Sequence, residues 1–89
     1  GDSGKRGNFF VKMTEKVEKD DYVIHKVVDK IGNRGWFYNY KMKDPTRMNP
    51  EIGDCFLMTA TPSRQEINKY DGGKHTYFNR ITVLENKGS

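Results

Sequence analysis

Apolar residues at every second position are the feature of this chain that most limits its fold. One face of the first such segment carries Phe9, Val11, Met13 and Val17, and polar residues occupy the other face. This period of two is typical of a strand with one buried face, and no segment repeats with the period of an amphipathic helix. Polar stretches rich in Gly, Asn and Asp separate the alternating segments, at Lys19–Asp21, Ile31–Gly35 and Tyr70–Lys74. The sequence therefore predicts an all-β domain.

Five strands are expected, over residues 9–18, 22–30, 36–40, 55–66 and 76–85. The long connection Lys41–Gly53 contains two prolines and can form at most one short turn. Met42 and Met48, in this connection, either cap one mouth of a barrel or form a patch for a protein partner. A three-strand meander, a longer crossing and a final hairpin favour a small closed barrel, because an open sheet of this size would leave exposed edges.

The OB-fold has this layout. We expect an all-β, five-stranded OB-fold-like barrel with little or no helix, in which the first strand pairs with the fourth and the third with the fifth. An SH3-like barrel is the alternative. We assign the barrel domain to residues 9–85 and treat residues 1–8 and 86–89 as flexible tails or linkers, because both ends are small and polar.

The composition limits the setting in which the domain works. A chain of 89 residues has room for one small core, and we expect it to be a module of a larger protein. No apolar run approaches the ~20 residues of a membrane span, so no membrane is expected among its partners. The single cysteine, Cys55, rules out an internal disulfide and fits a reducing compartment. We therefore expect an intracellular protein, cytoplasmic or nucleoid-associated.

Residues that could carry catalysis or hold a metal ion are few and scattered. Asp20 and Asp21 are neighbours in a turn, so their carboxylates point apart. His25 is expected to be a satisfied or exposed histidine, and Cys55 a small apolar filler without an activating partner. Together with His75, these two residues lack the close spacing of zinc ligands. No phosphate-binding loop or dinucleotide fingerprint occurs, so we expect no enzyme, no metal and no cofactor.

An almost wholly aromatic segment follows the first hairpin turn. Strand geometry places Arg34, Trp36, Tyr38 and Tyr40 on one face of it, with Phe37 and Asn39 on the other. If the first face looks outward, it is a platform on which the bases of a single strand can stack. Lys26 lies on the preceding strand, and the groove of an OB-fold runs across these two strands. The alternative is that the rings fill the core, which fits Trp36 equally well.

A second segment interleaves cations and aromatic rings around the last hairpin, at Arg64, Tyr70, Lys74, His75 and Tyr77. Positive charge meets phosphates and rings meet bases, so this composition suits a loop beside a single strand. The alternative is an ordinary solvated hairpin tip. Arg80 shares an expected face with Phe78 and Leu84, where it is either a groove cation or a half-buried arginine paired with a carboxylate.

Short motifs follow one another in the second half of the chain: Gly53-Asp54, Phe56-Leu-Met-Thr-Ala-Thr61, Tyr70-Asp-Gly-Gly-Lys-His-Thr76 and Asn79-Arg80-Ile-Thr-Val83. Their order resembles OB-fold modules in phage and mobile-element replication proteins, and the Gly32-Asn33 turn before Trp36 fits the same layout. The chain differs at Thr61-Pro62-Ser63 and in the longer Lys41–Pro50 insertion. The resemblance covers about residues 9–85 and implies single-stranded nucleic-acid binding, to DNA or RNA.

Two functions from different classes follow from these patterns. The first is a single-stranded DNA- or RNA-binding module within a larger replication, repair or RNA-handling protein. The second is a protein-interaction barrel, an adaptor that contacts other domains of a parent assembly. Sixteen Lys and Arg against 12 Asp and Glu give a net charge of +4, which is compatible with a polyanionic partner. Exposed basic residues around the aromatic face would favour the first function, and a charge-free apolar patch the second.

Overall fold

The computed structural model describes residues 5–43, 46, 49–67 and 72–88. Its strands are β1 (Gly7–Glu18), β2 (Val23–Asp29), β3 (Arg34–Phe37), β4 (Tyr40–Met42), β5 (Cys55–Ile67) and β6 (Lys74–Gly88). The described residues contain no helix. The expected third strand is divided into β3 and β4, because the backbone bends at Tyr38 and Asn39. β1 and β6 extend into the expected tails, and Gly88 pairs with Cys55 at the end of β6.

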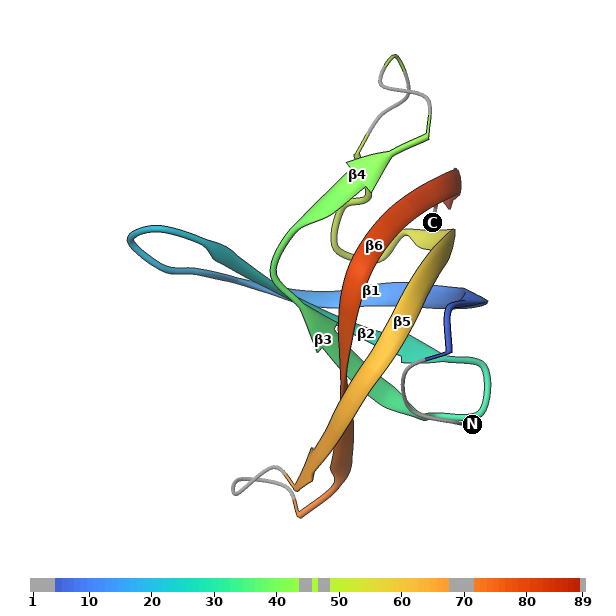
Figure 1. Cartoon of the computed structure of the whole chain (residues 1–89). Coiled ribbons are helices and arrows are strands. Elements are labelled where there is room, and N and C mark those ends of the chain that lie inside the picture. The colour runs from blue at the N-terminus through green and yellow to red at the C-terminus, as the bar shows by residue number, and fades with distance from the viewer. Residues whose placement is uncertain (1–4, 44–45, 47–48, 68–71, 89) are drawn as a thin grey trace.

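The strands close into a barrel (Figure 1). β1 pairs antiparallel with both β2 and β5, and the β2–β3 and β5–β6 pairs are also antiparallel. The barrel closes where β3 runs parallel to β6, and β4 continues this parallel pairing further along β6. The expected first–fourth and third–fifth pairs correspond to β1–β5 and β3–β6. The five-stranded OB-like barrel is therefore confirmed.

A bulge in β1 changes which side chains face the core. The register of β1 against β2 shifts between Met13 and Glu15, which moves the alternation by one position. Lys16 then pairs with the buried His25. Val17 therefore lies on the opposite side of the sheet from Met13, although the simple alternation had placed the two together.

A second bulge lies at Arg80 in β6. Arg80 has a left-handed φ of 56°, and the pairing of β5 with β6 shifts between Thr59 and Thr61 at this point. As a result Phe78 and Ile81 both face the core, while Arg80 is exposed. The expectation that Arg80 shares a face with Phe78 is wrong, and so is the half-buried alternative for its side chain.

The core runs along the barrel axis and is closed at one end by residues 49–54 of the β4–β5 connection. Its buried side chains are Val11, Met13, Val27, Phe37, Phe56, Met58, Ala60, Phe78, Ile81 and Val83. Pro50 is fully buried, and Met42 packs against the core from the end of β4. The Gly53 amide donates to the Met13 carbonyl at 2.8 Å, which fixes the connection on β1. Met42 therefore caps this end of the barrel, and Met48 lies outside the described residues.

Candidate nucleic-acid interface

The outer face of β2, β3, β6 and β5 holds most of the side chains that the sequence pointed to. The pairing registers set Lys26 beside Trp36, Trp36 beside Tyr77, and Tyr77 beside Arg64. Paired residues project from the same side of a sheet, so these four side chains form one row across the barrel. The next residue on β3, Phe37, is buried in the core. Phe37 fills the barrel, and Trp36 lies half-buried on the outside.

Two hairpin arms stand on either side of this row. β5 pairs with β1 only as far as Ala60, and beyond it β5 has β6 as its neighbour. The first residues of β2, Val23 and Ile24, pair with β1 before the β3 pairing begins at His25. Both hairpins therefore extend beyond the barrel, to the left and downward in Figure 1. The row lies on the strands between these arms.

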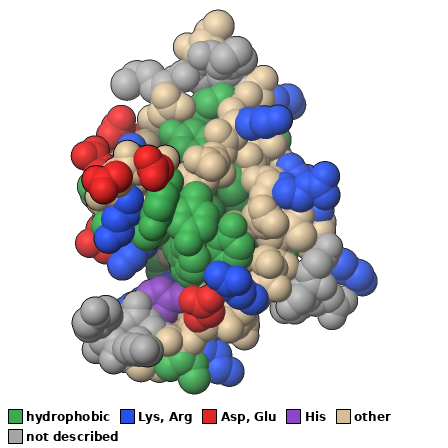
Figure 2. Space-filling view, turned by 60° about the vertical axis from the view of Figure 1, so that its left-hand side comes forward, with side chains coloured by type: hydrophobic (Ala, Val, Ile, Leu, Met, Phe, Trp, Pro, Cys, Tyr) green, Lys and Arg blue, Asp and Glu red, His purple; other side chains and the backbone are tan. Residues whose placement is uncertain are grey.

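Four rings from three segments of the chain contact one another on this face; we call Tyr22, Trp36, Tyr38 and Tyr77 the aromatic cluster. The ring centroids of Trp36 and Tyr77 lie 4.6 Å apart, and Tyr38 lies 5.1 Å from Trp36 and 5.7 Å from Tyr77. Tyr22 meets Tyr38 edge-on at 5.0 Å and is 43% exposed. Figure 2 shows a face on which hydrophobic side chains gather between charged ones.

Cations border the aromatic cluster on both sides. The Arg64 guanidinium lies over the Tyr77 ring, 5.0 Å from its centroid, and its Nε pairs with Glu66 at 2.7 Å. On the other side, the Lys26 ammonium lies 3.3 Å from a Glu15 carboxylate oxygen. Both pairs are at least partly exposed, and such pairs contribute only about 0–1 kcal/mol. A phosphate can therefore compete with these carboxylates.

A neighbouring row of side chains lies toward the start of β6. The exposed Arg34 pairs with both Val28 and His75, and His75 in turn pairs with Glu66. His75 is buried, with 9% of its surface exposed, so it supports the face more than it offers a contact. Lys74, the first residue of β6, is exposed beside it.

A hollow of about 730 Å³ adjoins the aromatic cluster between β4 and β6. Tyr38 and Tyr77 line it together with the cations Arg6, Lys41 and Arg80, and its described lining includes no carboxylate. Arg6 donates to the Arg80 carbonyl and, at 3.3 Å, to the Thr82 hydroxyl, so it crosses β6 at the bulge. The exposed Arg80 thus belongs to a positively charged extension of the cluster.

Tyr40 does not join the outer face. Because the backbone bends between β3 and β4, its ring turns inward and packs against the core, 6.0 Å from Phe37 and 5.1 Å from His25. Burial raises the pKa of the Tyr40 hydroxyl, and the nearby Glu51 charge acts in the same direction. The expected grouping of Tyr40 with Tyr38 is therefore wrong.

His25 is buried, with 7% of its surface exposed, so the exposed alternative is wrong. It stacks on Phe37 with ring centroids 5.1 Å apart, and its Nδ1 atom has no hydrogen-bond partner among the described residues. Burial lowers the pKa of His25 below 6.5, the Lys16 charge lowers it further, and a hydrogen bond with the Tyr38 backbone opposes both. A neutral His25 therefore supports the bend that turns Tyr38 outward.

The interface brings together most of the sequence-predicted residues, namely Lys26, Arg34, Trp36, Tyr38, Arg64, Lys74, His75 and Tyr77, with Arg80 in the adjoining hollow. Tyr70 lies outside the described residues. Sequence reasoning missed Tyr22, although the alternation of β2 puts it on the same face as Lys26. It also missed Arg6, because the residue falls in the expected tail.

A comparison with protein families, with curated proteins and with solved structures finds no match. Within the described ranges, no three His, Cys, Asp or Glu side chains gather closely enough to hold a metal ion. The same part of the chain has no helix of the length and apolar character that a membrane crossing needs.

Proposed function

We propose that this face binds single-stranded nucleic acid, and that the domain holds a single strand for a larger replication, repair or RNA-handling protein. The aromatic cluster is the observation that carries the proposal. Its rings are partly or largely exposed and come from β3, β6, the bend after β3 and the residue before β2. Every base has a flat π face, so such rings bind single strands with little sequence preference, at ~1–3 kcal/mol per stacked base.

The charge around the cluster supports the same proposal. Arg34 and Arg64 lie toward the start of β6, and Arg6, Lys41 and Arg80 line the hollow on the other side. A strand stacked on the rings would meet cations on both sides, which can neutralise its phosphates. A docking site for a neutral protein surface would be expected to lack this border of charge.

The first test uses Trp36, the only tryptophan, as a fluorescent reporter on the face itself. Titration with poly-pyrimidine DNA and RNA oligonucleotides at low salt should change its emission. Tyr38→Ala should weaken binding by ~1–3 kcal/mol, because one stacking surface is lost. Phe10→Ala is the matched control and should leave affinity unchanged, since that exposed ring lies on β1 opposite Leu57 and outside the aromatic cluster. No binding at low salt would reject the proposal in favour of the adaptor function.

A second test compares two exposed lysines on the same strand. Lys74 lies beside the proposed interface, whereas Lys87 lies at the far end of β6 and pairs with Glu85 at 2.9 Å. Lys74→Ala should weaken binding to all sequences about equally and reduce the slope of log affinity against log salt by ~0.7. Lys87→Ala should leave the slope unchanged. Equal effects of the two substitutions would mean that general positive charge, and not this face, attracts the strand.

A further inference from the structure

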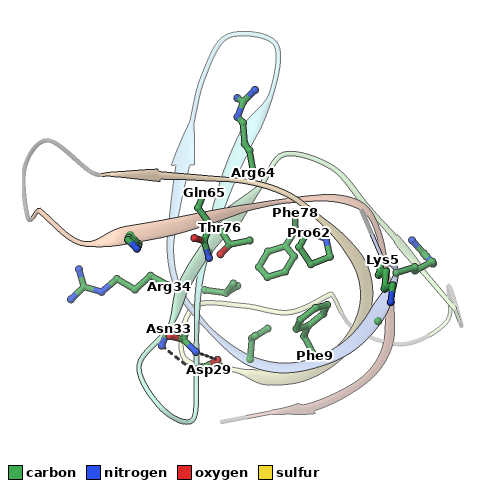
Figure 3. Close-up of a pocket in the computed structure, with 16 residues that line it drawn as sticks. Lys5, Phe9, Asp29, Asn33, Arg34, Pro62, Arg64, Gln65, Thr76 and Phe78 are labelled. Atoms are coloured by element: carbon green, nitrogen blue, oxygen red, sulfur yellow. Dashed lines mark hydrogen bonds between the residues drawn. The ribbon is translucent and has the colours of Figure 1, made fainter. Parts of the chain in front are cut away.

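The end of the barrel opposite the β4–β5 connection opens into a cavity of about 850 Å³, which we call the mouth (Figure 3). It lies between the start of β1, the β2–β3 turn and the point where β5 and β6 leave the barrel. Phe9, Phe78 and Pro62 project into it, and the two phenylalanine rings lie 5.0 Å apart at 59°. Small-molecule sites in proteins have volumes of about 300–1,000 Å³ and mostly apolar linings. The mouth therefore has the size and the floor of a site for a flat apolar group.

The rim of the mouth is positively charged, with Lys5, Arg6, Arg34, Arg64 and Lys74 among its lining residues. Asp29 is the acidic residue in the described lining, and hydrogen bonds occupy its carboxylate. One of its oxygens accepts from the Ile31 and Asn33 amides at 3.0 and 2.8 Å, and the other accepts from the Asn33 side chain at 3.0 Å. Asp29 thus serves the β2–β3 turn, and the rim favours an anion.

The mouth adjoins the aromatic cluster through two arginines. Arg34 and Arg64 line the mouth and also belong to the rows of the outer face. Tyr77, over which Arg64 lies, points outward, while the next residue on β6, Phe78, points into the mouth. A chain of nucleotides stacked on the outer face therefore reaches the rim around Arg64. From there, only the terminal nucleotide of the strand can enter the mouth.

We propose that the mouth holds a terminal nucleotide of the strand. The base lies against Phe9, Phe78 and Pro62, and the terminal phosphate remains at the rim among the cations. The shape supports this arrangement, because Figure 3 shows the charged ends of Arg34 and Arg64 outside the apolar floor. The inference rests on the proposed function, since the outer face supplies the rest of the strand. It adds a preference for strand ends over internal segments.

The test compares a linear oligothymidine of about twelve nucleotides that carries a terminal phosphate with a covalently closed circle of the same composition. Trp36 fluorescence measures binding to the outer face, and the methyl resonances of Val11 and Val27, which line the mouth, report its occupation. The linear strand should bind about tenfold more tightly than the circle and should alone shift the valine methyls. Oligonucleotides with the phosphate at the 5′ or the 3′ end identify which end enters.

Thr76→Phe is the matching variant. Thr76 lines the mouth and is half-buried, so a phenylalanine there fills the cavity without altering the outer face. It should reduce the affinity for the linear strand to that for the circle and leave the circle unaffected. Ser63→Phe, which adds the same ring at an exposed position outside the mouth, should preserve the preference.

The outcomes separate this inference from the proposed function. Equal affinity for linear and circular strands, with unshifted valine methyls, overturns the inference and leaves the binding face intact. No change of Trp36 fluorescence with either strand rejects the proposed function. In that case adenosine monophosphate tests the mouth alone: shifted valine methyls assign it to a free nucleotide, and unshifted ones overturn the site.

Discussion

At one end of the barrel the β4–β5 connection covers the core, whereas at the other end no described segment does. The capped end is filled by Phe37 and Pro50, both fully buried, and Tyr40 and Met42 pack against the core. At the mouth, Phe9 is only half-buried and faces a cavity. The Phe37 ring at the capped end is fully enclosed, whereas Phe9 borders a cavity, so we expect a larger loss of stability per ring removed at the capped end.

The difference teaches that, in one small barrel, the residues that close the core can be separate from those that are exposed for binding. The bend after β3 sends Tyr40 into the capped end and leaves Tyr38 on the outer face. The cations that line the hollow and the mouth are exposed and lie outside the core cluster. Substitutions at the two ends should therefore change different properties of the protein.

The largest expected effect is at the capped end. Phe37→Ala removes a fully buried ring and should lower the free energy of unfolding by ~3–5 kcal/mol. Phe9→Ala, at the mouth, should lower it by only about 1–2 kcal/mol, because that ring already borders a cavity. Chemical denaturation of both variants measures the difference. Equal losses in the free energy of unfolding would show that the two ends contribute equally to stability, and would contradict the contrast drawn between them.

A smaller effect is expected where β3 approaches Phe78. A Cβ atom on Gly35 would lie 2.4 Å from Cε2 of the Phe78 ring and 3.0 Å from the Thr76 carbonyl oxygen. Gly35→Ala should therefore cost ~1–3 kcal/mol, with the ring pushed toward the mouth. Gly7→Ala is the control, because its Cβ would meet only the Phe9 ring, at an ordinary 3.8 Å. A loss of stability in the control as large as in Gly35→Ala would point to backbone effects instead of the close ring contact.

The smallest effect concerns pH and the capped end. The folded state keeps His25 neutral because its pKa lies below the ordinary value of 6.5, whereas the unfolded chain takes up a proton near pH 6.5. Stability should thus be constant above this pH and fall as the pH drops below it. Denaturation midpoints at about pH 7.5 and about pH 5.5 measure the fall. His25→Leu should flatten it; an unchanged slope in His25→Leu would assign the dependence to other groups.

The strand period and the turn residues were sufficient to predict the barrel, because both are local properties of the sequence. They also gave Trp36 and Tyr77 as candidate residues, but the alternation left open whether Trp36 faces outward or into the core. The errors lie at irregularities that the alternation cannot reveal. Tyr40 was placed on the wrong face because the bend at Tyr38–Asn39 is stabilised by contacts with another strand, including His25. No local pattern in the sequence marks that bend.

The parallel seam between β3 and β6 has a consequence for how the protein folds. The β1–β2 and β5–β6 hairpins join residues close in sequence, whereas the seam joins Arg34 to His75 and Trp36 to Tyr77. Pairing across such a separation carries a larger loop-closure entropy, so we expect the seam to form late. The aromatic cluster spans this seam and is complete only once it has closed. A bound strand would then stabilise the β3–β6 pairing. It should slow hydrogen exchange at the β3 amides more than at the amides of either hairpin.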